Sequence, residues 1–136
     1  MDRRNKILLL RASYWIGTIV DAFVAVELLL PAFWASFEGL TAYTPNSILN
    51  FALGTAGALM FGWTVLLVWA DRKPLERKGV LLLTIFPVIF GIQLNNIVSV
   101  TSGLRSLQSA AVELIVGFAI AVLFIFSYLN ARHEAT

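Results

Sequence analysis

The chain has 136 residues, of which 59% are hydrophobic and only 13% are charged. Because soluble domains contain about 25% charged residues, this composition excludes an ordinary soluble domain and favours one surrounded by lipid. The sequence has a net charge of +2, no cysteine and a single histidine, His133 in the C-terminal tail, which excludes disulfides, thiolate metal sites and bis-histidine haem.

Four apolar segments follow one another at residues 12–35, 47–70, 79–103 and 108–129. Each has at least the ~20 residues that an α-helix needs to cross a hydrocarbon layer about 30 Å thick. The connections, residues 36–46, 71–78 and 104–107, leave no room for a soluble domain and place neighbouring helices antiparallel. The sequence therefore predicts an all-α integral membrane protein, residues 1–136 forming a single transmembrane domain built as an antiparallel four-helix bundle.

The distribution of Lys and Arg predicts the orientation of this bundle. Nine of the ten basic residues lie in the N-terminal part up to Arg11, in the connection 71–78 or in the C-terminal tail, whereas the opposite side has only Arg105. Because cytoplasmic loops are enriched in Lys and Arg, we expect an N-in/C-in multi-pass protein of a cell inner or plasma membrane. The same rule accounts for the basic clusters, so no nucleic-acid partner is expected.

Each segment also carries small and polar residues at a spacing of four, which keeps them on one helix face. The four stripes are Gly17, Asp21 and Ala25; Asn50, Gly54, Ala58 and Gly62; Pro87, Gly91, Asn95, Ser99 and Gly103; and Ser109, Glu113, Gly117 and Ala121. Small residues let membrane helices approach closely, so we expect these faces to pack against other helices. Pro87 is expected to bend the third helix.

The candidate functional residues are the polar side chains inside the apolar segments. Counting at 1.5 Å per residue places Asp21 near the midplane, and Glu27, Gln93, Asn95, Asn96 and Glu113 at about one level in the outer half. A charged side chain in the membrane core costs at least ~2.5 kcal/mol, and the segments contain no Lys or Arg to offset it. We therefore expect protonated carboxyl groups, mutual hydrogen bonds, a bound cation or a water-filled cavity rather than an internal salt bridge.

These residues support three functional hypotheses. Carboxylate and amide oxygens suit hard cations, so the first is a channel or transporter for a cation, a proton or a small polar solute. Its ligand- or ion-binding residues would be Glu113, Asp21, Glu27, Asn95, Asn96 and Gln93, lining an outward-facing polar cavity. Four short helices barely enclose a path, so a homo-oligomer is expected; apart from a bound cation, no cofactor is.

The second hypothesis is a non-catalytic subunit or scaffold that binds another membrane protein. In that case Asn95, Asn96 and Glu113 are interhelical hydrogen-bonding groups, each worth less than ~1–2 kcal/mol. The third is an intramembrane enzyme, for which the sequence gives little support. Asp21 and Glu113 differ in expected depth by ~10 Å, too far for direct acid–base cooperation. Membrane lipid is a partner under all three hypotheses.

Overall fold

A computed structural model describes residues 2–40, 44 and 46–133. The elements in chain order are α1 (Arg3–Leu29), α2 (Pro31–Phe37), α3 (Ser47–Asp71), α4 (Gly79–Leu83), the π-helix η1 (Thr84–Ile89), α5 (Phe90–Thr101) and α6 (Leu107–Ala131). The elements α4, η1 and α5 are continuous. Together with α1, α3 and α6 they make four helices that are long and apolar enough to cross a membrane. The prediction of an all-helical fold with four helices that could span a membrane is confirmed.

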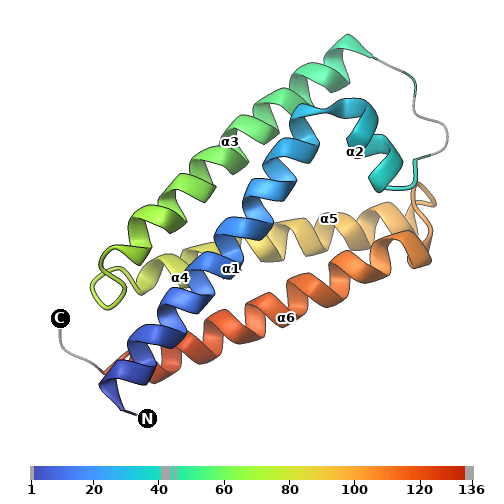
Figure 1. Ribbon diagram of the computed structural model, residues 1–136. Helices are drawn as coiled ribbons and strands as arrows, with labels where there is room; N and C mark the ends of the chain where they lie inside the picture. Colours follow the sequence, from blue (N-terminus) through green and yellow to red (C-terminus); the bar gives the residue numbers. More distant parts are fainter. Residues whose placement is uncertain (1, 41–43, 45, 134–136) are drawn as a thin grey trace.

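The four long helices form two pairs, α1 beside α3 and α5 beside α6 (Figure 1). The pairs meet at the end of the molecule that contains the first turns of α1 and the last turns of α6, which we call the terminal end. From there they diverge toward the opposite end, the loop end, where α2 lies (Figure 1). This divergence leaves space between the pairs at the loop end.

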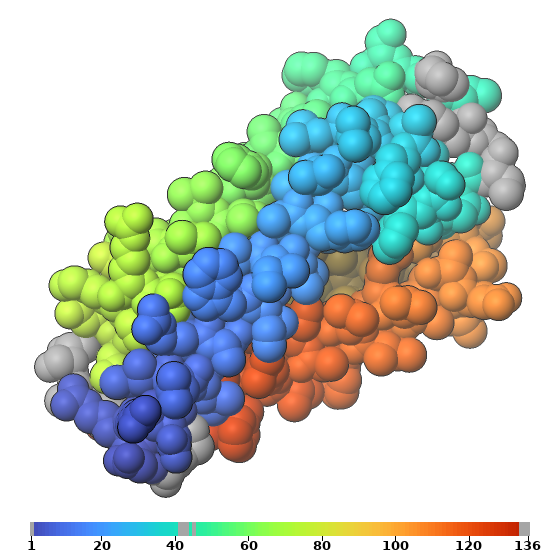
Figure 2. Space-filling view, viewed as in Figure 1, coloured from blue at the N-terminus to red at the C-terminus, as the bar shows by residue number. Residues whose placement is uncertain are grey.

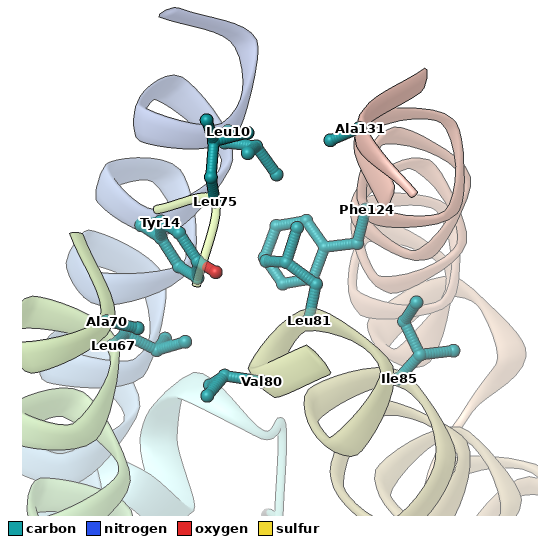
Figure 3. Packing of buried hydrophobic residues seen from close by; sticks show 10 residues of the cluster. All are labelled: Leu10, Tyr14, Leu67, Ala70, Leu75, Val80, Leu81, Ile85, Phe124 and Ala131. Atoms are coloured by element: carbon teal, nitrogen blue, oxygen red, sulfur yellow. The ribbon is translucent and has the colours of Figure 1, made fainter. Parts of the chain in front are cut away.

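A buried apolar cluster closes the terminal end (Figure 3). It combines side chains of all four long helices and of the turn before α4: Leu10, Tyr14, Leu67, Ala70, Leu75, Val80, Leu81, Ile85, Phe124 and Ala131. Polar contacts join the same helices, since Arg11 of α1 donates hydrogen bonds of 3.1 and 3.3 Å to the Asp71 carboxylate at the end of α3. The hydroxyl oxygens of Ser13 and Ser127 lie 2.7 Å apart between α1 and α6. These contacts fix the helices against one another where apolar packing alone is not directional.

The first apolar segment is divided at Leu30, although the sequence predicts one helix over 12–35. The helix α1 extends back to Arg3 and ends at Leu29, and α2 begins at Pro31. Proline suits the first position of a helix because its φ is fixed and the amide hydrogen it lacks would have no partner there. Of the expected connection 36–46, residues 41–43 and 45 lie outside the described part of the chain.

Glycines on α1 and α6 pack as their stripes predict. A Cβ atom at Gly17 would lie 2.9 Å from Cζ of Phe124, and one at Gly117 would overlap the side chain of Gln93. Both are contacts between different helices, and at either position a Cβ atom would force the neighbouring side chain to shift. Close approach at small residues is the usual mode of helix packing in membranes.

The stripe predicted on the second segment does not pack within the described bundle. Cβ atoms at Gly54 and Gly62 would have no neighbour within 4 Å among the described residues, and the Asn50 side chain is exposed. The glycine of α3 that packs is Gly57, whose Cβ would lie 3.2 Å from the backbone oxygen of Ala25. This helix has small residues on two faces, and spacing alone does not say which face meets α1.

The stripe predicted on the third segment is confirmed at Ser99 but wrong at Gly91 and Asn95. Gly91 and Asn95 are exposed, whereas Asn96 and Ser99 are buried. Pro87 lies within η1, whose hydrogen bonds span five residues and so add one residue to a turn. One extra residue rotates the following faces by about 100°, which moves Asn96 into the position expected for Asn95.

Candidate functional site

A cavity of about 740 Å³ lies between the two helix pairs. Its walls come from all four long helices and α2. Gly17 and Phe124 border it on the side of the buried cluster, and Glu38 and Arg105 border it at the loop end. Pockets of about 300–1,000 Å³ are typical of small-molecule sites in proteins. The cavity is therefore large enough for an organic ligand and much larger than a dehydrated ion requires.

The loop end of the cavity is organised around Arg105, whose side chain is 4% exposed. Its guanidinium donates hydrogen bonds to Asn96 Oδ1 at 3.3 Å and to Glu113 Oε2 at 3.2 Å, and it forms an ion pair with the carboxylate of Glu38. Nε of Arg105 also donates to the backbone oxygen of Glu38 at 3.1 Å. These four residues, the Arg105 cluster, tie the end of α2 to α5 and α6.

This cluster corrects the expectation that no internal salt bridge is available. The sequence places Arg105 in a loop outside the membrane, but the connection turns back at Gly103, which adopts a φ of 75°. The long Arg side chain then reaches inward to Glu113, eight residues further along the chain. Glu38 and Arg105 were not among the predicted site residues. The sequence does distinguish them in one respect: each is a charged residue in one of the two weakly charged connections at the loop end.

Two carboxylates share the single guanidinium of the Arg105 cluster. Hydrogen bonding to Glu113 raises the pKa of Arg105, so the guanidinium stays charged. The pKa of Glu38 is also raised, because burial and the nearby Glu113 carboxylate together outweigh the attraction of Arg105. Glu38 therefore takes up a proton at a higher pH than an ordinary glutamate does.

We expect Glu38→Gln to change the pH dependence of stability. The folded protein binds the Glu38 proton more tightly than the unfolded chain, whose ordinary pKa is 4.5. The contribution of Glu38 to stability is thus fully present below this value and is lost as the pH rises through the folded-state pKa. Thermal unfolding of both proteins is measured in detergent from about pH 4 to about pH 8. The midpoint temperature of the wild type should fall relative to that of the variant as the pH rises. A difference that does not vary with pH would contradict this assignment.

Two further carboxyl groups, both on α1, line the cavity. Asp21 is 9% exposed and Glu27 is 3% exposed. Asp21 Oδ2 and Glu27 Oε1 are buried and have no hydrogen-bond partner in the described part of the chain. Buried polar atoms in proteins are normally paired, so an unpaired carboxyl oxygen that faces a cavity marks a place for a ligand, a proton or water.

The amides of α5 complete the polar lining. Gln93 donates from Nε2 to the backbone oxygen of Glu113 at 3.2 Å, which leaves Gln93 Oε1 buried and unpaired. Asn96 accepts from Arg105, and its Nδ2 is buried and unpaired within the described chain. Asn95 borders the cavity as well, although its side chain is exposed.

The structure thus brings all six predicted residues to one cavity: Asp21, Glu27, Gln93, Asn95, Asn96 and Glu113. Their role in binding stays a prediction. The described residues contain no group of three or more His, Asp or Glu side chains arranged to hold a metal ion. No family model matches the chain, and neither a curated protein nor a solved structure matches it.

Proposed function

We propose that the chain is a transporter or channel for a cation, a proton or a small polar solute, built as an antiparallel four-helix bundle. Its N-in/C-in orientation in an inner or plasma membrane rests on the basic residues, nine of which lie toward the terminal end. Arg105, the remaining one, is buried in ion pairs in the folded chain. In this orientation the polar end of the cavity faces outward.

The observation that carries the proposal is the pair of unpaired carboxyl oxygens, Asp21 Oδ2 and Glu27 Oε1, in a cavity between membrane helices. Four carboxyl groups border this cavity, and Arg105 is the one basic residue among its described lining. An excess of buried carboxylates is costly in a membrane unless protons, cations or water compensate it. A site of this kind is suited to bind and release positive charge.

A complete path requires a change at the terminal end, where the buried apolar cluster closes the cavity. Helix rearrangement or assembly of a homo-oligomer would supply it. The row Gly54, Ala58 and Gly62 lies on a face of α3 whose two glycines have no described neighbour, which also fits the second candidate, a subunit that binds another membrane protein. The enzyme hypothesis gains no comparable support.

Cysteine accessibility tests the proposal, because the natural chain has no cysteine. Asn95→Cys, which lines the cavity, should react with a membrane-impermeant thiol reagent added outside intact vesicles, since the thiolate forms only in contact with water. Leu94→Cys is the matched control: its side chain is 52% exposed and does not line the cavity, so it should not react. Glu76→Cys, in the turn at the terminal end, should react only from the cytoplasmic side.

Two results would contradict the proposal. Silence at Asn95→Cys, in protein that keeps its helical circular dichroism, would mean a dry cavity and favour the subunit hypothesis. Reaction of Glu76→Cys with reagent added outside would mean that the orientation is the reverse of N-in/C-in. Measuring the flux of cations, protons or polar solutes into reconstituted vesicles then distinguishes transport from binding alone.

A further inference from the structure

The walls of the cavity are mostly apolar, which restricts the kind of ligand it can hold. Aliphatic side chains from three spans face the space between the Arg105 cluster and the floor, among them Val20, Val24, Ile89, Ile92, Val116 and Ile120. An inorganic cation would lose its water against these walls and gain few ligands in return. A ligand with an apolar body of its own gains free energy from the same walls.

The unpaired polar atoms define the other part of the ligand. Three of the four in the described chain are acceptors when the carboxyl groups are ionised: Asp21 Oδ2, Glu27 Oε1 and Gln93 Oε1. A matching ligand therefore brings hydrogen-bond donors and positive charge. Glu27 lies within the electrostatic influence of Arg105, whereas Asp21 has no ion pair in the described structure and lies one turn from the cavity floor at Gly17. A cationic ligand would therefore stabilise the Asp21 carboxylate more than the Glu27 carboxylate.

The cavity is also reached from the side. Lining residues of α1 and α6 are exposed at the same time, with Ile19 65% and Val112 65% accessible. Figure 2 shows a hollow between these two helices above the region where they meet. Both residues belong to apolar membrane-spanning helices, so this opening faces hydrocarbon. A ligand with an apolar body can enter it directly from the lipid phase.

We propose that the cavity binds an amphipathic organic monocation, a protonated amine on an apolar body, which enters between α1 and α6 and places its ammonium group at Asp21. This inference deepens the proposed function and rests on it, because it names the class of cation that the cavity carries. The ammonium supplies the donors that the unpaired carboxyl oxygen lacks, and the apolar body replaces lipid or water along the walls. Anionic and uncharged amphiphiles of the same length lack the matching charge.

The test uses Val116→Cys, which lines the cavity, and Glu76→Cys, which is exposed in the turn at the terminal end and does not. Their reaction with N-ethylmaleimide is followed in reconstituted vesicles with octylamine, octanol or octanoate. Near-saturating octylamine should slow labelling of Val116→Cys about tenfold, as expected when about a tenth of the sites remain free. Octanol and octanoate, which enter the membrane without the positive charge, should have little effect. No compound should affect labelling of Glu76→Cys.

Asp21→Asn in the Val116→Cys background should abolish protection by octylamine, whereas Glu76→Gln in the same background should leave it unchanged. Labelling that octylamine does not slow, or slows no more than octanol does, would overturn the inference while leaving a hydrated cavity in place. If Val116→Cys does not react at all, the midpoint temperature of thermal unfolding is the deciding measurement. Octylamine must then raise the midpoint of the wild type but not of Asp21→Asn, or the inference is wrong. Failure of the proposed function itself appears separately, as silence at Asn95→Cys.

Discussion

Replacing Arg105 with methionine is expected to lower the free energy of unfolding by about 3–5 kcal/mol. The substitution keeps an unbranched side chain but removes the only guanidinium that the Glu38 and Glu113 carboxylates share. Two partly buried carboxyl groups then face each other without a counter-charge, which is the costly way to break an ion pair inside a protein. Titration of the micellar protein with sodium dodecyl sulfate, followed by circular dichroism, measures the change.

Arg72→Met is the matched control, because Arg72 is exposed in the turn at the terminal end. Loss of an exposed charge there should cost less than about 1 kcal/mol. Adding Glu113→Gln to Arg105→Met should recover part of the loss, since it removes one of the two uncompensated charges. Equal destabilisation by Arg105→Met and Arg72→Met would mean that the Arg105 cluster does not form in the folded protein.

Gly17→Val is expected to destabilise the protein by about 1–3 kcal/mol through overpacking. A Cβ at this position would lie 2.9 Å from Phe124 Cζ and 3.0 Å from Leu67 Cδ1, and both of these side chains are fully buried. Phe124 borders the cavity, but both side chains are packed in the buried cluster, so either they or α1 must shift to admit the valine. The same titration in micelles measures the effect.

Gly62→Val introduces the same side chain on α3 where a Cβ would have no described neighbour within 4 Å. It carries the same change in backbone freedom and helix propensity, so the difference between the two variants isolates the packing contact. Gly62→Val should stay close to the wild type. If it is as unstable as Gly17→Val, backbone effects explain both, and α1 does not approach α6 as closely as the structure has it.

The sequence predicts the four spans well because the thickness of the hydrocarbon layer sets their length. It also predicts which residues of α1 and α6 face inward, since Gly17, Asp21 and Gly117 each combine small size or charge with a place on one stripe. A charged or very small residue in a membrane helix has few acceptable surroundings. Such positions carry information even without a known partner.

Other features depend on contacts that spacing does not encode. The inward path of Arg105 requires a turn at Gly103 and partners at the end of α2, on α5 and on α6, and the length of the loop reveals neither. The burial of Asn96 rather than Asn95 follows from the π-helix around Pro87, which shifts the helix faces by one residue. On α3 the packing glycine is Gly57, because the partner helix and not the sequence pattern decides between two small faces.

The Arg105 cluster also links the folding of the loop end to the order of synthesis. Glu38 leaves the ribosome 67 residues before Arg105, and Glu113 follows Arg105 by eight residues. During the making of the second and third helices, the Glu38 carboxylate cannot yet pair with Arg105 and is more stable in water or among headgroups than in hydrocarbon. The contacts that join the end of α2 to α5 and α6 therefore form only once the chain has been made as far as the fourth helix.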